Sequence, residues 1–79
     1  MKHPFDVHVG ARLCLCRRSA GMTREELGAR IGIDARKIRE FEKGEDRIEA
    51  GLLRNVAAVT GFTAAFFFDG LAGALSDVA

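Results

Sequence analysis

The side chains with the clearest potential for chemistry lie in residues 35–43, where charged and apolar residues are interleaved. Ile38 and Phe41 are three residues apart, so in a helix they share one face. The opposite face then carries the candidate contact residues, which are Ala35, Arg36, Arg39 and Glu40. A guanidinium can donate to guanine O6 and N7, a carboxylate can accept from the cytosine amino group, and a methyl group can contact thymine. Recognition of base edges is therefore one use of this face; for Arg36, phosphate contact or a purely solvated charge are alternatives.

Two short helices joined by a sharp turn would position these side chains. The spacing of Gly28, Gly32 and Ile38 predicts such a pair of helices. Gly28 keeps the first helix narrow where the second crosses it, and Gly32 tolerates the positive φ of a turn. Ile38 then supplies a β-branched anchor between the helices. This pattern is a helix-turn-helix signature, and it favours nucleic-acid binding over catalysis.

Capping signals mark where these helices begin and end. Thr23 and Glu26 have the spacing of a capping box, Asp34 is a good N-cap residue, and Gly44 suits a left-handed C-terminal position. We therefore expect one helix from Arg24 to Arg30 or Ile31 and a second over residues 35–43.

The remaining chain predicts three further helices in a single domain. We expect one from Val7 or His8 to Ser19, one over residues 50–60, and a short one from Thr63 to Phe68 or Asp69. Residues 1–6 are expected to form an arm, because Pro4 blocks helix continuation. Ile48 should point inward, and residues 70–79 form a short tail whose structure the pattern leaves open.

These motifs resemble the lambda-repressor-like (Cro/repressor, XRE) helix-turn-helix family of bacterial and phage regulators. The resemblance runs from about Val9 to Leu71, and its matching segments are Arg17-Arg18 and residues 21–28, 31–33, 38 and 41–44. It implies an all-α fold, a compact bundle of five helices with the helix-turn-helix in the second and third. It also implies a partly buried ion pair between Arg17 and Glu42 that positions the recognition helix.

The resemblance further implies contacts to the DNA backbone. Thr23 and Arg24 fall where family members clamp a phosphate at the start of the second helix. The other candidate phosphate contacts are Lys37, Lys43 and Arg47. Two positions depart from the family: many members carry glutamine in place of Arg24, and a neutral serine or threonine in place of Asp34. Arg24 could instead lie over its own helix.

The charge is unevenly distributed along the 79 residues, although the net charge is only +1. Residues 1–44 carry ten Lys and Arg against six Asp and Glu, whereas residues 45–79 carry two against five. The basic half contains the helix-turn-helix, which suits a face turned toward phosphate, although ordinary solvated charge is the alternative. No apolar run approaches 18 residues and no secretory signal is evident, so we expect a cytoplasmic protein, associated with the nucleoid when bound to DNA.

Two cysteines and two histidines raise the question of a metal, but their spacing fits no known zinc site. Cys16 lies on the apolar stripe of its helix and should be buried. Cys14 lies off that stripe, where it could be a tolerated surface residue, a protein contact or a redox-sensitive thiol. We expect no metal, no cofactor and no small-molecule substrate.

Phenylalanines dominate the last predicted helix. Three consecutive ones span about 200° of a helix, so they cannot all face one core. We expect Phe62 and Phe68 in the core. The candidate dimer interface is Phe66, Phe67, Leu71 and Leu75.

The expected function is sequence-specific binding of double-stranded DNA by a transcriptional regulator. We expect a repressor that acts as a homodimer on a two-fold symmetric operator, with residues 35–43 in the major groove. A restriction–modification controller or an antitoxin of the same fold is an alternative. A protein-interaction adaptor without DNA binding is another, favoured by four carboxylates near this face, namely Asp34, Glu40, Glu45 and Asp46. An enzyme is the least supported class, because no nucleophile–base pair is evident.

Overall fold

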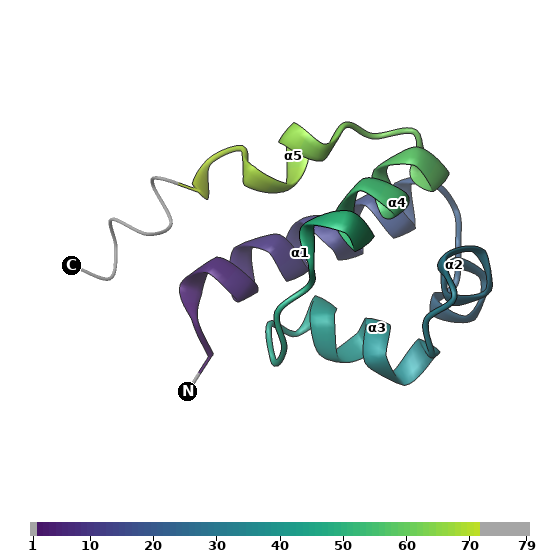
Figure 1. Cartoon of the computed structure of the whole chain (residues 1–79), viewed down its shortest axis with the longest axis horizontal. Helices are drawn as coiled ribbons and strands as arrows, with labels where there is room; N and C mark the ends of the chain where they lie inside the picture. Colours follow the sequence, from purple (N-terminus) through teal and green to yellow (C-terminus); the bar gives the residue numbers. More distant parts are fainter. Residues whose placement is uncertain (1, 72–79) are drawn as a thin grey trace.

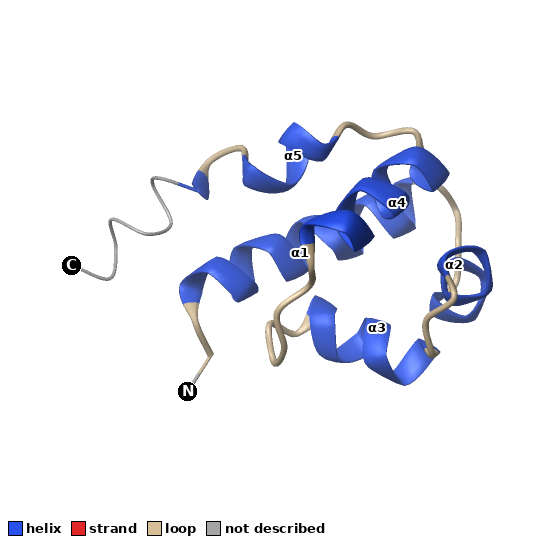
Figure 2. Cartoon of the chain, viewed as in Figure 1, coloured by secondary structure: helices blue, strands red, loops and turns tan. Residues whose placement is uncertain are grey.

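Helices are the only regular elements in the part of the chain that the structure describes. A computed structural model describes residues 2–71 and contains no strand there, as Figure 2 shows. Its helices are α1 (Pro4–Ser19), α2 (Arg24–Ile31), α3 (Ala35–Glu42), α4 (Ala50–Thr60) and α5 (Ala64–Phe68). The predicted all-α, five-helix fold is confirmed.

The first helix, α1, is the centre of the bundle. It packs against α3, α4 and α5, while α2 packs against α3 and α4 (Figure 1). The buried apolar residues form one cluster to which every helix contributes: Val9, Leu13, Cys16, Leu27, Ile38, Phe41, Ile48, Leu53, Val56, Ala57 and Phe67. Ile38 and Phe41 thus hold α3 with one face inward and leave its other face outward.

The start of α1 differs from the prediction. The helix begins at Pro4, three residues before Val7, so residues 4–6 are helical and not part of an arm. Proline is well tolerated at the first helical position, because the N–H it lacks would have no partner within the helix. His3 serves as the N-cap, and its Nδ1 accepts a hydrogen bond from the Phe5 N–H at 3.0 Å.

The turn between α2 and α3 follows the prediction closely. Thr23 and Glu26 form a reciprocal capping box, and Gly32 ends α2 in the left-handed region with φ of +74°. A Cβ on Gly28 would lie 2.2 Å from the carbonyl oxygen of Ile33 and 3.3 Å from Cδ1 of Ile38. Gly28 is therefore required both for the turn and for the close packing of α3 against α2.

The ends of α3 are fixed by a cap and by close backbone packing. Asp34 Oδ1 accepts from the Arg36 N–H at 2.7 Å, as expected of an N-cap. The helix ends at Glu42, one residue earlier than predicted, and Gly44 follows with φ of +72°. A Cβ on Gly44 would lie 2.8 Å from the Cα of Val7, so the chain after α3 passes directly against α1.

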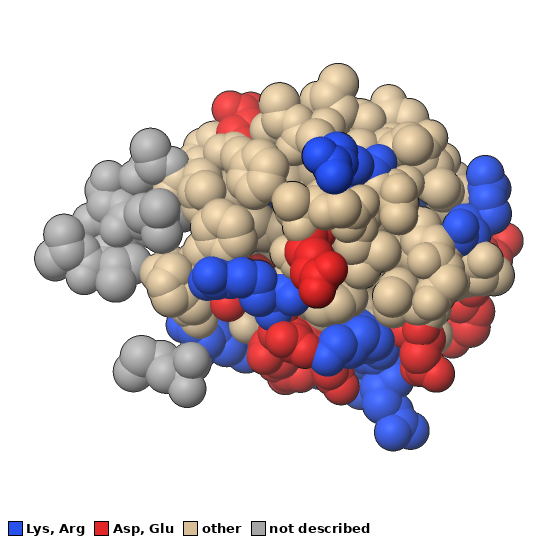
Figure 3. Space-filling model, viewed as in Figure 1, with Lys and Arg blue, Asp and Glu red and all other residues tan. Residues whose placement is uncertain are grey.

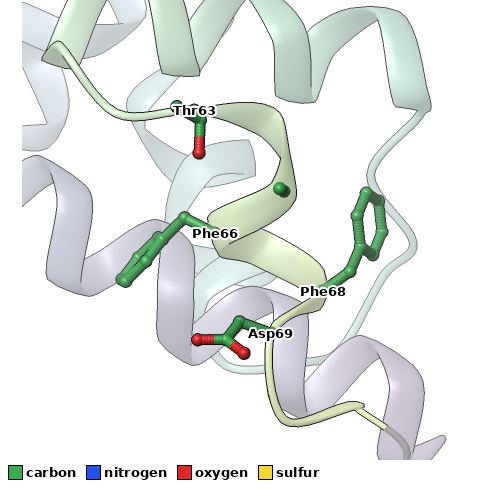
Figure 4. Close-up of a pocket in the computed structure, with 5 residues that line it drawn as sticks. Thr63, Phe66, Phe68 and Asp69 are labelled. Atoms are coloured by element: carbon green, nitrogen blue, oxygen red, sulfur yellow. The ribbon is translucent and has the colours of Figure 1, made fainter.

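The phenylalanines of α5 are arranged differently from the prediction. Phe67 is fully buried, so it belongs to the core, and its prediction at a dimer interface is wrong. Phe68, predicted to be in the core, is instead 39% exposed. Phe66 and Phe68 project from different sides of α5 in Figure 4. Phe62 and Phe66 are partly buried against the core, with ring centroids 4.8 Å apart. Leu75 lies outside the described residues.

The two cysteines are free and occupy different environments. Cys16 is fully buried, as predicted, and burial raises the pKa of its thiol to about 11. It therefore stays protonated near neutral pH and packs as a small apolar residue. Cys14 is half-buried, and its Sγ lies 3.8 Å from Nη2 of Arg17.

Among residues 2–71, no helix has the length and apolar character needed to cross a bilayer. No group of three or more potential metal ligands comes together in the same range.

Candidate nucleic-acid interface

The outward face of α3 presents side chains whose charges are not neutralised within the described chain. Arg36, Arg39 and Lys43 are exposed, and none of them forms a salt bridge with another residue of the range 2–71. Ala35 and Glu40 on the same helix are half-buried. Figure 3 shows Lys and Arg together with Asp and Glu along the edge formed by α3, whereas the surface over α4 and α5 is mostly uncharged.

Lys37 is in a different situation from its neighbours on α3. Its Nζ pairs with a carboxylate oxygen of Asp46 and lies 3.4 Å from Oε1 of Glu40. The hydrogen bond to Asp46 raises the pKa of Lys37, and the same contact lowers the pKa of Asp46. The ammonium also lies 5.5 Å from the centre of the Phe41 ring. A phosphate would have to compete with these internal partners for Lys37.

Arg47, in the loop after α3, is likewise engaged within the chain. Its Nε donates to Oδ1 of Asp6 at 2.8 Å, and its guanidinium carbon lies 4.8 Å from the centre of the Phe5 ring. Both partners belong to the first turn of α1, so Arg47 ties the loop to that turn. Because Asp6 is 41 positions away in sequence, the spacing of local motifs gave no sign of this contact.

Glu42, the last residue of α3, has a buried carboxylate at the junction of three helices. The predicted pair is confirmed: Arg17 donates from Nε to Oε2 of Glu42 at 2.6 Å and from Nη2 to Oε1 at 3.1 Å. Arg24 is a third member that sequence reasoning did not foresee, donating from Nε to Oε1 of Glu42 at 3.0 Å. Burial would raise the pKa of Glu42, but the hydrogen bonds and charges of the two arginines outweigh it and lower that pKa. Glu42 is therefore ionised at neutral pH and joins α1, α2 and α3.

The Glu42 carboxylate makes the free energy of unfolding depend on pH. Because the pKa of Glu42 is lower in the folded state than its ordinary value of 4.5, its contribution is present above that pH and is lost as pH falls toward the folded-state pKa. We expect the free energy of unfolding, measured by urea denaturation between pH 7 and pH 3, to fall below about pH 4.5. The double variant Arg17→Met, Glu42→Leu should lack this part of the decline. An identical pH profile in the double variant would contradict the assignment.

Backbone contact at Gly10 also positions α3, and the sequence motifs did not predict it. A Cβ on Gly10 would lie 2.1 Å from the carbonyl oxygen of Phe41 and 3.1 Å from that of Glu42. The available signal was a glycine inside a helix, which costs up to about 1 kcal/mol relative to alanine and so suggests a close approach.

The fold and this arrangement of α2 and α3 place the chain in a known class. A family model described as a helix-turn-helix domain matches residues 8–65, and the chain belongs to this family.

The chain is similar to curated relatives and to a solved structure. It is 38% identical over 71 residues to an uncharacterized HTH-type transcriptional regulator of Sinorhizobium medicae, covering 90% of this chain and 51% of the relative. It is 33% identical over 69 residues to an uncharacterized transcriptional regulator in the ATPase CF(0) region of Rhodospirillum rubrum, covering 87% and 64% of the two chains. The chain thus spans about half to two-thirds of the length of these relatives.

The solved structure is that of the clp gene regulator ClgR from Corynebacterium glutamicum. It superposes with a TM-score of 0.82 at 24% identity, covering 96% of this chain and 81% of that chain. At this identity the similarity supports the fold alone.

Proposed function

We propose that this chain is a sequence-specific, double-stranded DNA-binding transcriptional regulator that works in the cytoplasm. In this proposal α3 enters the major groove, with Ala35, Arg36, Arg39 and Glu40 facing base edges and Lys43 facing the backbone. The start of α2, at Thr23 and Arg24, would contact phosphate. The regulator names of the curated relatives support this function.

The observation that carries the proposal is the set of unpaired cations on the outward face of α3. Two of the four acidic residues that favour an adaptor are engaged internally, since Asp34 caps α3 and Asp46 pairs with Lys37. A third, Glu40, lies 3.4 Å from Nζ of Lys37, and Glu45 is exposed. Arg36, Arg39 and Lys43 thus outnumber the carboxylates on the outward face, which suits a polyanion.

We also propose that the protein acts as a homodimeric repressor through the surface around α5. Phe68 is exposed beside an open hollow lined by Thr63, Ala65, Phe66, Phe68 and Asp69 (Figure 4). Leu71, three residues after Phe68, is half-buried, and apolar surface of this kind is suited to covering by a second copy. A two-fold symmetric pair of subunits would place two α3 helices about one DNA turn apart. Occupying a promoter in this way would repress transcription.

Selection from random duplex DNA tests the proposal. We expect enrichment of a two-fold symmetric site, with an affinity that falls steeply as salt rises. Arg36→Ala should relax the preference at one base pair of each half-site by about 1–3 kcal/mol. Arg54→Ala on α4 is the matched control and should leave the selected site unchanged. If no sequence were enriched, the result would contradict regulation through specific DNA binding.

A further inference from the structure

Two arginines share the carboxylate of Glu42, and they differ in how many donors they use. Arg17 has a side chain that is 10% exposed, and it donates to Glu42 from Nε and Nη2 and to the carbonyl oxygen of Met22 from Nη1 at 2.9 Å. All three nitrogens of its guanidinium are therefore used inside the protein, which makes Arg17 a structural residue.

Arg24 uses only one nitrogen. Its Nε donates to Glu42, whereas Nη1 and Nη2 have no hydrogen-bond partner among residues 2–71. Its side chain is 35% exposed, against 2% for Glu42. The buried carboxylate thus holds the inner edge of the guanidinium, and the two terminal nitrogens are left for another acceptor.

The backbone at the same place also has free donors. Arg24 is the first residue of α2, and the hydroxyl of Thr23 accepts only from the N–H of Glu26. The N–H groups of Arg24 and Glu25 have no intrahelical partner, because they belong to the first turn. An anion near the terminal nitrogens of Arg24 would approach these backbone donors as well.

We propose that Glu42 positions Arg24 for a DNA backbone phosphate: the carboxylate holds Nε, and Nη1 and Nη2 are presented to the phosphate oxygens. This inference rests on the proposed DNA binding and identifies how one of its contacts is prepared. A guanidinium held in place loses less conformational freedom on binding than a free side chain. Arginine can do this because its planar fork has donors on two edges, which the single ammonium group of lysine lacks.

A double-mutant cycle on the site selected above tests the proposal. Arg24→Ala should weaken binding to all sequences about tenfold and reduce the slope of log affinity against log salt by about 1. Glu42→Gln should weaken binding about threefold to tenfold alone, and by much less in the Arg24→Ala background, because Glu42 acts through Arg24. An equal loss from Glu42→Gln in both backgrounds would overturn the positioning role and leave Glu42 purely structural.

Arg24→Lys keeps the test decisive even if Glu42→Gln fails to fold. It leaves the Arg17–Glu42 pair intact and retains the charge, so the salt slope should stay near that of the wild type while affinity falls several-fold. Wild-type affinity in Arg24→Lys would overturn the proposal. Absence of salt-dependent binding by the wild-type protein would instead overturn the proposed function itself, so the two failures are distinguishable.

Discussion

Alanine at position 10 is expected to destabilise the domain by about 3 kcal/mol, close to the whole stability of a protein of this size. The added Cβ would lie 2.1 Å from the carbonyl oxygen of Phe41, a backbone atom at the end of α3. No side-chain rotation can relieve this contact, so α1 and α3 would have to move apart. Urea denaturation followed by circular dichroism measures the loss.

Gly51→Ala is the matched control for this substitution. Gly51 also lies in a helix, but a Cβ there would have no atom within 4 Å beyond its immediate surroundings. Alanine favours helix over glycine, so this variant should be unchanged or stabilised by up to about 1 kcal/mol. If Gly10→Ala were equally stable, the close approach of α1 to α3 would be wrong.

Alanine at position 67 is expected to cost about 3–5 kcal/mol, because it removes a fully buried aromatic ring and leaves a cavity. The ring belongs to the central cluster, and it lies 6.1 Å from the ring of Phe66. We expect thermal unfolding of Phe67→Ala to begin far below that of the wild type.

Phe68→Ala is the neighbouring control. Phe68 is 39% exposed and its ring lies 6.2 Å from that of Phe5, so its truncation should cost much less than that of Phe67. Both variants should be measured at two protein concentrations, which separates any contribution of self-association. A larger loss for Phe68→Ala than for Phe67→Ala would restore the orientation of α5 expected from sequence.

The helix-turn-helix could be predicted because its determinants are local. The capping box at Thr23, the left-handed Gly32 and the cap at Asp34 each fix the backbone within a few residues. Gly28 and Ile38 then specify how closely the two helices approach. The Arg17–Glu42 pair came from the family resemblance rather than from any local rule.

The incorrect predictions concern features that depend on residues far apart in sequence. Three consecutive phenylalanines do not reveal which one faces the core, because packing against α1 and α4 sets the rotation of α5. Lys37 also pairs with Asp46, nine positions away, and Arg47 pairs with Asp6, 41 positions away, so local spacing did not indicate either of these two contacts. Pro4 predicts a helix start after residue 6, but its place at the first position of α1 makes it compatible with the helix.

The close contacts of α3 with Gly10 and Gly28 have a consequence for how DNA specificity could change. These contacts are made by backbone atoms and by the inward residue Ile38. Neither involves the side chains of Arg36, Arg39 or Lys43. Substitution of those outward residues would therefore leave the docking angle of α3 unaltered. Under the proposed function, the outward residues of α3 could be exchanged to change the base preference without altering the packing that holds the helix.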